Sequence, residues 1–290
     1  MPRRAPAVER VIAVLNLLAA HPGQPYTLSD IARDLSLNKA TLHAILWALT
    51  QAGYLVRDPV AKSYTVGPAL IALGNAAMEG FAVVHSAMPE MEALTADLGH
   101  DCVASAAIHD EIVILARTGT PQPFGVNILP GMRVPLSPPL GTVFIAWSGQ
   151  EEIDRWLSRV GPAAAADKKN LDRYREAVEG VRSRGFSIGV ASSTESRSGG
   201  RSLEESVRNL PAEYALLELD NSDSYMLRHI GAPVFGSRGE VVLALFLMGF
   251  QNEIPAEQVP KMAERLQMAC RRISDAIDGR TPAELASAGA

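Results

Sequence analysis

The sequence has only two cysteines and no long uninterrupted apolar run. Cys102 and Cys270 lie far apart and form no CxxC pair, so neither a disulfide framework nor a cysteine-based zinc site is indicated. The longest apolar stretch, Val241–Phe250, is much shorter than the roughly 20 residues that cross a bilayer. Glu9 and Arg10 interrupt the apolar segment that a signal peptide needs. We therefore expect a cytoplasmic protein that makes no contact with a membrane.

Signature motifs of several enzyme classes are absent as well. The chain has no HExxH helix, Walker loop or GxGxxG turn. Ser192–Thr194 lies near acidic residues, but the only later histidine is His229, so a solvated loop is favoured over a nucleophile. One candidate metal site comprises His100, Asp101, His109 and Asp110, which flank a predicted strand. Such residues at strand ends more often form turns. We predict no enzyme activity, no cofactor and no metal.

Length and composition describe an ordinary globular chain of about two domains. It has 290 residues, of which 47% are hydrophobic and 20% are charged. Residues 1–74 hold seven basic and four acidic residues, a net charge of +3, whereas the whole chain carries −5. Residues 75–290 therefore carry −8. A basic N-terminal segment on an otherwise acidic chain favours binding of nucleic-acid phosphates by that segment.

The segment Tyr26–Thr65 has the pattern of a winged helix-turn-helix. Thr27-Leu28-Ser29-Asp30 is a capping signal, in which a hydroxyl and a carboxylate satisfy backbone donors at a helix start. A turn follows, and Asn38 is suited to cap a second helix from Lys39 to about Gln51. Gly53 ends that helix, since glycine closes a helix at little cost. Two short helices, a tight turn and a hairpin most often form a DNA-binding module.

The second helix has one buried and one open face. Leu42, Ile45, Leu46 and Leu49 form an apolar stripe. On the open face, His43 could reach a base edge or a phosphate, or could simply be a solvent-exposed polar residue. Trp47 is unusual there, and we expect it to fold onto the wing or to cover a neighbouring subunit rather than to contact a base. The predicted DNA contacts are Thr27, Ser29, Asn38, Lys39, Thr41, His43, Trp47, Arg57, Lys62 and Tyr64.

The rest of the chain is predicted to be an α+β domain, with helices packed on a curved and largely antiparallel sheet. Gly67-Pro68 opens a connector helix that leads toward Val84. The predicted strands are 102–108, 111–117, 124–129, 186–191, 214–219, 228–235 and 240–249, and the predicted helices are 88–98, 140–147, 151–157, 171–184 and 255–278. Ser192–Asn209 has little to bury and is expected to be a mobile loop.

The order of these motifs resembles the isocitrate-lyase-regulator (IclR) family of transcription factors. The similarity lies in Val-Glu-Arg-Val-Ile-Ala-Val-Leu at 8–15, in the helix-turn-helix at 27–49 and in the wing and exit at 53–70, and it continues at 131–141, 184–187 and 230–234. The resemblance implies a winged-helix head and a GAF-like effector domain, which we place at 1–67 and 85–280 with the connector helix at 68–84 between them. The last residues, 281–290, are expected to be a flexible tail. It also implies a dimer formed through the heads, alone or as a dimer of dimers.

The recognition helix departs from the family. Where the family has Ser-Thr-x-His-Arg, this chain has Ala40-Thr41-Leu42-His43-Ala44. The lost serine and arginine suggest fewer phosphate contacts and a different operator.

The resemblance also places an effector pocket in the C-terminal domain, where Phe246 and Met248 stand at positions that carry hydroxyls in binders of small acids. Because an unmatched buried charge is costly, they favour a larger, partly apolar ligand. They could instead simply fill the core. The predicted pocket residues are Phe124, Ile128, Leu129, Pro139, Leu140, Gly141, Asp220, His229, Phe246 and Met248, with Ser192–Asn209 as a lid.

The sequence therefore predicts a ligand-responsive transcriptional regulator that binds double-stranded DNA and a small-molecule effector as a homodimer on a palindromic operator. The alternative is a GAF-like sensor whose head mediates protein contacts.

Overall fold

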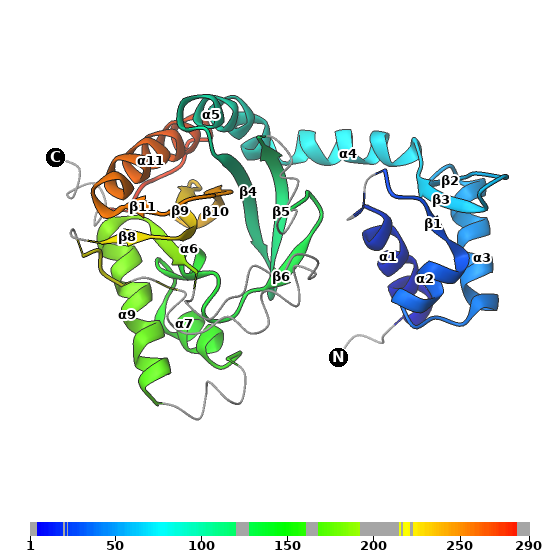
Figure 1. The fold of residues 1–290 in the computed structure, drawn as a ribbon, viewed down its shortest axis with the longest axis horizontal. Helices are drawn as coiled ribbons and strands as arrows, with labels where there is room; N and C mark the ends of the chain where they lie inside the picture. The colour runs from blue at the N-terminus through cyan, green and yellow to red at the C-terminus, as the bar shows by residue number, and fades with distance from the viewer. Residues whose placement is uncertain are drawn as a thin grey trace. The chain divides into compact units, whose positions relative to one another are not determined.

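The computed structural model describes residues 5–19, 21, 23–119, 128–160, 168–191, 215, 217–220 and 223–282. The chain divides into two compact units, residues 1–81 and 82–290 (Figure 1). We call them the N-terminal unit and the C-terminal unit.

The N-terminal unit packs three helices against a small antiparallel sheet. The helices are α1 (Pro6–Ala19), α2 (Leu28–Asp34) and α3 (Lys39–Gln51). The sheet has the order β1-β3-β2, with β1 at Tyr26–Thr27, β2 at Leu55–Arg57 and β3 at Ser63–Val66. The core collects one apolar face from each helix and includes Val14, Leu18, Ile31, Leu42, Leu46 and Leu55.

Two helices follow the wing, where the sequence suggested one connector. The first, α4, spans Ala69–Gly80, and the second, α5, spans Ala82–Leu98. The helix predicted over residues 68–84 is therefore broken at Phe81, directly after a glycine, the weakest helix former apart from proline. Val84 is buried in the core of the C-terminal unit, so the helix predicted at 88–98 begins one and a half turns earlier.

The C-terminal unit contains a six-stranded sheet in which every pairing is antiparallel. Its order is β6-β5-β4-β10-β9-β7, so β4, β10 and β9 are interior strands. The strands are β4 (Asp101–Ile108), β5 (Glu111–Thr118), β6 (Arg133–Pro135), β7 (Ser187–Val190), β9 (Leu227–Phe235) and β10 (Val241–Met248). The predicted α+β class and antiparallel sheet are confirmed.

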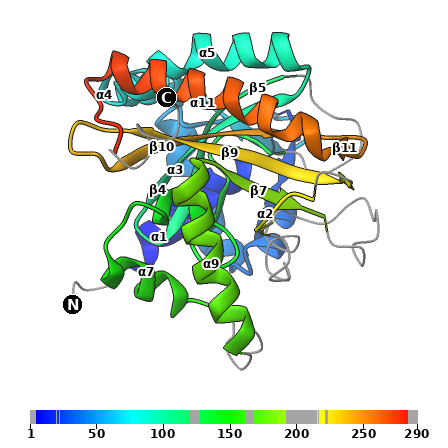
Figure 2. The same cartoon turned by 90° about the vertical axis from the view of Figure 1, so that its left-hand side faces the viewer.

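Helices cover both faces of this sheet (Figure 2). On one face lie α5 and α11 (Val259–Ala276), which bury Leu243, Leu245 and Leu247. On the other lie α6 (Thr142–Ile145), α7 (Gln150–Leu157) and α9 (Lys168–Arg184), which enclose Phe144, Trp156 and Tyr174. We call the second side the α6 face.

Several secondary-structure predictions need correction. The strand predicted over 214–219 is wrong where it can be compared, because Ala215 forms only an isolated bridge with Gly189 and residues 217–219 form no strand. Residues 128 and 129 are not in a strand either, and the rest of the strand predicted at 124–129 lies outside the described residues. The short pair β8 (Ser224–Tyr225) and β11 (Ile254–Pro255), followed by the 3-10 turn η2 (Ala256–Gln258), was not predicted.

Candidate nucleic-acid interface and ligand site

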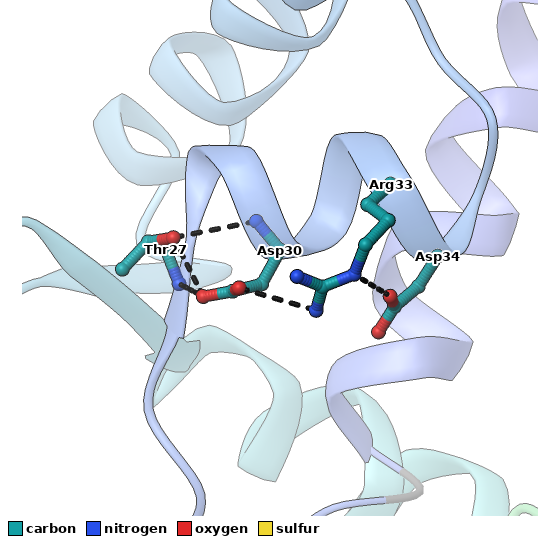
Figure 3. Close-up of polar contacts among 4 residues, drawn as sticks. All are labelled: Thr27, Asp30, Arg33 and Asp34. Atoms are coloured by element: carbon teal, nitrogen blue, oxygen red, sulfur yellow. Dashed lines mark hydrogen bonds and ion pairs between the residues drawn. The ribbon is translucent and has the colours of Figure 1, made fainter.

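The capping box predicted at the start of α2 is present. The Thr27 hydroxyl oxygen accepts the backbone N–H of Asp30 at 3.3 Å, and the Asp30 carboxylate accepts the backbone N–H of Thr27 at 3.1 Å (Figure 3). Hydrogen bonds from Thr27 hold the pKa of Asp30 below its ordinary value. Arg33 bonds Asp34 at 3.0 Å and lies 3.2 Å from Asp30. The Thr27 side chain therefore fixes the helix start, whereas Ser29 is exposed.

Both ends of α3 are closed as the sequence predicts. The Asn38 side-chain oxygen accepts the backbone N–H of Ala40 at 2.8 Å. At the other end Gly53 has a φ of 75°, and the N–H groups of Gly53 and Tyr54 donate to the carbonyls of Thr50 and Leu49. This is a Schellman arrangement, which needs a positive φ at the glycine. Asn38 is therefore engaged as a cap, and α3 is a well-defined element that follows the turn after α2.

The outer face of α3 is polar, open and free of acidic residues. Lys39, Thr41 and His43 are exposed, and the helix sequence contains no aspartate or glutamate. Trp47 shares this exposure, with 62% of its surface accessible. The idea that Trp47 folds back onto the wing is therefore wrong for a single chain. Such a surface suits a polyanion, because nothing on it repels phosphate.

The wing is a short hairpin with a rigid tip. The Asp58 carboxylate accepts the backbone N–H groups of Val60 and Ala61 at 2.7 and 3.0 Å, which keeps its pKa below the ordinary value. Arg57 and Lys62 flank this tip and are exposed. Tyr64 differs from its predicted role, because it is only 6% exposed and packs in the core. Tyr64 is paired with Tyr26 of β1, and both rings pack in the core of this unit.

A cluster of four side chains occupies the α6 face of the large sheet. The ring of His229 lies 5.3 Å from that of Phe246, edge to face, and Phe246 lies 6.4 Å from Phe144 of α6. The ring nitrogen Nε2 of His229 is 3.2 Å from the hydroxyl of Ser187. Burial, with Arg184 nearby, lowers the pKa of His229 to about 4, so the imidazole is neutral at physiological pH.

The loop before α6 is fixed against this cluster. Trp156 Nε1 donates to the Leu140 carbonyl at 2.9 Å. Gly141 has a φ of 89°, and a Cβ there would overlap the Leu136 side chain, so glycine is required on both counts. Pro139 is buried and Leu140 is half-buried. The predicted residues Leu140 and Gly141 therefore lead directly into α6, which carries Phe144 onto Phe246.

Comparison with known proteins gives a family match for the helix-turn-helix and relatives over longer stretches of the chain. Residues 7–59 match the IclR helix-turn-helix domain. The DNA-binding transcriptional repressor YiaJ of Escherichia coli K12 is 30% identical over 117 residues, 40% of this chain but only 41% of YiaJ. The HTH-type transcriptional regulator BhcR of Paracoccus denitrificans is 22% identical over 271 residues, 92% of this chain and 86% of BhcR.

Solved structures share the fold over nearly the whole chain. An IclR transcriptional regulator from Alicyclobacillus acidocaldarius has a TM-score of 0.69 at 22% identity, covering 96% of this chain and 100% of its own. An IclR homologue from Microbacterium hydrocarbonoxydans, complexed with 4-hydroxybenzoate, has a TM-score of 0.65 at 19% identity, covering 93% and 98%. The chain belongs to the IclR family of transcriptional regulators. It is a DNA-binding regulator of a non-enzymatic family.

Other predicted ligand residues of this IclR regulator make contacts of their own or lie outside the described chain. The Ile128 carbonyl accepts a hydrogen bond from Arg117 at 3.4 Å, and the Leu129 N–H donates to Met132. Asp220 is exposed beside β8, where its backbone N–H donates to the Tyr225 hydroxyl at 2.8 Å. Phe124 lies outside the described residues, as do the Ser192–Thr194 run and the whole Ser192–Asn209 lid.

Three of the four residues considered for a metal, His100, Asp101 and Asp110, make other contacts in this IclR regulator. Asp101 forms an ion pair with Arg117 at 2.8 Å, and Asp110 pairs with Arg159. The ring of His100 lies 4.4 Å from that of Phe250. Over the described part of the chain, no three His, Cys, Asp or Glu side chains come close enough to share an ion.

Within the described residues no single helix has both the length and the apolar composition to cross a membrane. Only α4 and α5 taken together, Ala69–Ala77 with Ala82–Leu98, would do so on those two grounds.

Sequence reasoning missed three residues of the candidate ligand site. Ser187 bonds His229, Gly231 lies under the ring of Phe246, and Ser105 is buried on the same face. Strand alternation could have identified Ser187. It precedes Ile188, which is buried in the core on the α5 and α11 side, so the serine side chain lies on the opposite face of the sheet.

Proposed function

We propose that this IclR regulator binds a roughly palindromic operator as a dimer and that an effector in the C-terminal unit controls this binding. The observation that carries the proposal is the acid-free, exposed face of α3 on a capped helix-turn-helix, with basic residues beside it on the wing. Two such heads require half-sites that are separated by about one helical turn or a multiple of it.

The heads are the proposed dimer contact. Among the described residues, most of the exposed large apolar side chains belong to the N-terminal unit, and in α1 and α4 they include Val8, Ile12, Ile71 and Leu73. Met268 is the one such side chain in the described part of the C-terminal unit. An apolar surface of this kind on one unit favours association through that unit.

The proposed DNA contacts divide by chemistry. Lys39 at the start of α3 and Arg57 and Lys62 beside the wing tip supply charge for phosphates, and the N-terminus of α3 adds its dipole. His43 is one turn into the helix, where it reaches a base edge or a phosphate. Thr41 and Ser29 supply hydroxyls, and Thr27 and Asn38 contribute by fixing the two helix starts.

The proposed effector is an organic acid or its ester with an aromatic, alicyclic or acyl portion. Phe246 and Met248 are only partly buried although β10 is an interior strand, so the α6 face keeps apolar surface available to a ligand. Pro139, Leu140, Gly141 and His229 complete this site, with Ile128, Leu129 and Asp220 further out. The structural relative that binds 4-hydroxybenzoate holds an aromatic acid, which lies within the proposed class.

Effector binding is proposed to act through population shift. The segment 68–84 joins the two units, and an effector that binds one arrangement of the dimer better than another favours that arrangement. The expected consequence is a change in the spacing of the two α3 helices, and hence in operator affinity.

Fluorescence anisotropy of labelled DNA tests the proposal. The intergenic region upstream of the protein's own gene and a shuffled sequence of equal length are titrated at moderate and high salt, and sedimentation gives the stoichiometry. We expect two chains per site and a preference for the natural sequence at both salt concentrations. Equal affinity for both DNAs, or one chain per site, would contradict the proposal.

A further inference from the structure

The two faces of the large sheet differ in side-chain size. Toward α5 and α11 the interior strands present large residues that are fully buried, among them Leu243, Leu245 and Leu247. Toward α6 the neighbouring strands present small residues: Val103, Ser105, Ser187, Gly231 and Ala244. Figure 2 shows the helix layers on the two sides. Phe246 itself is only partly buried, so the helices do not cover the whole of the α6 face.

Two buried polar atoms on this face lack a partner among the described residues, the indole Nε1 of Trp147 and the hydroxyl of Ser105. Ser105 is 1% exposed, and its hydroxyl makes no hydrogen bond within the described residues. Its cross-strand partner Ala244 packs with α6 and α7, whereas flanking Ala104 packs with the opposite core. Alternation therefore directs the Ser105 hydroxyl into the α6 layer. A buried hydroxyl without a partner costs about 1–3 kcal/mol, so its presence calls for a group that satisfies it.

The charged side chains nearest to Ser105 by strand register, Arg117 and Asp101, neutralise each other. Its neighbours across the strands are Ala244 and Ile114, and Phe246 lies diagonally beside it. The nearest cation by register is Arg117, opposite Val103, and Arg117 is in a buried ion pair with Asp101. A carboxylate placed at Ser105 would thus compete with Asp101, and a neutral polar group would not.

The position of Phe246 decides where a ligand would lie. A Cβ on Gly231 would overlap the Phe246 ring, so the ring extends over β9 and away from β4. Val103 and Ser105 are consequently not covered by that ring, although other side chains bury both of them in the free protein. An apolar ligand stacked beside Phe246 would bring its own substituent to the Ser105 hydroxyl.

We propose that Ser105 is an effector-binding residue and that the effector carries a neutral hydrogen-bonding group (a hydroxyl, ketone or ester) next to its apolar portion. The proposal rests on the proposed function, since it assigns the ligand chemistry of the same site. The Ser187–His229 pair lies on the other side of Phe246 and is already hydrogen-bonded.

The free protein gives a first test. Because Ser105→Ala removes an unpaired buried hydroxyl, we expect the Tm of the ligand-free protein to rise by about 2–4 °C. Ser224→Ala, an exposed serine of β8, is the control and should leave the Tm unchanged. No rise for Ser105→Ala would overturn the proposal, because the hydroxyl would then have a partner in the free protein.

Matched probes give the second test. Calorimetric titration of the full-length protein, without DNA, compares 4-ethylphenol and ethylbenzene. Wild type should bind both probes, and 4-ethylphenol more tightly. Ser105→Ala should weaken 4-ethylphenol about 5–10-fold and leave ethylbenzene unchanged; Ser224→Ala should change neither.

The outcomes separate this proposal from the proposed function. Equal effects of Ser105→Ala on both neutral probes, or no effect on either, would overturn the role of Ser105. Failure of wild type to bind either neutral probe at millimolar concentration would overturn the ligand class. The wild-type preparation used for calorimetry is also assayed for operator binding. If that protein does not bind the operator, the proposed function fails, whatever the calorimetry shows for Ser105.

Discussion

Gly231 in β9 lets the ring of Phe246 in β10 extend across the neighbouring strand. The two residues are paired in register, and a Cβ at position 231 would overlap the ring edge and lie 2.8 Å from the Ser187 hydroxyl. The backbone at Gly231 does not have a positive φ, so the requirement for glycine is steric. This contact sets the place of the aromatic ring in the proposed effector site.

Gly231→Ala should therefore destabilise the protein by about 1–3 kcal/mol, because the added methyl group forces the Phe246 ring out of position. Urea denaturation measures the change. Gly180→Ala is the matched control: this glycine is in α9, where a Cβ would lie 4.0 Å from the Leu217 carbonyl, so alanine should be neutral or stabilising by up to about 1 kcal/mol. A Gly231→Ala protein as stable as wild type would show that the ring lies elsewhere.

His229 should make stability depend on pH. Its pKa is about 4 in the folded protein against 6.5 without perturbation, so the unfolded chain binds more protons between these values. The contribution is complete above about pH 6.5 and is lost as the pH falls toward 4. At pH 5 the loss is about 2 kcal/mol relative to pH 7.

The comparison with His229→Gln isolates this effect, since the partly buried His100 also has a lowered pKa and acts in the same direction. The glutamine variant should lose less stability than wild type between pH 7 and pH 5. Identical pH profiles would mean that His229 titrates normally and is not buried as described.

Thr27→Ala should loosen the start of α2 by about 1 kcal/mol, because the cap hydroxyl satisfies an otherwise free backbone donor. Hydrogen exchange of the α2 amides in the full-length protein measures this. Ser29→Ala, in the same turn but not a cap, provides the comparison and should leave exchange near the wild-type rate. Equal exchange in both variants would argue against the capping box.

Trp47 should report DNA binding by fluorescence. It is 62% exposed, whereas Trp156 is fully buried and Trp147 is largely so. If α3 enters the groove, operator DNA should shift or quench the emission of wild type and leave Trp47→Phe unchanged. A change on dilution without DNA would instead place Trp47 against the partner subunit.

Local signals predicted the N-terminal unit well. The capping box at Thr27, the Asn38 cap and the Gly53 terminus each depend on residues within one turn of the helix, and all three are confirmed. The apolar stripe of α3 is confirmed for Leu42, Leu46 and Leu49, while Ile45 is half-buried.

The candidate ligand site was harder to predict because its residues come together through long-range strand pairing. Ser105, Ser187 and Gly231 come from three strands, and their common face follows from registers that the sequence does not display. A lone serine in an apolar strand, as in Val103-Ala-Ser105-Ala-Ala107, gives no sign of which face it occupies until its partners are known. The helix break at Phe81 was missed because the apolar pattern continues through it.

The most direct test of the central claim is the salt dependence of operator binding by a variant with Lys39, Arg57 and Lys62 all changed to alanine. Each lost phosphate contact removes about 0.9 from the slope of log K against log salt, so we expect the slope to fall by about three and the affinity to drop for all DNA sequences. A control with the same charge change in the C-terminal unit, Lys168→Ala, Lys261→Ala and Arg271→Ala, should keep the wild-type slope. An unchanged slope and affinity in the first variant would contradict DNA binding through α3 and the wing.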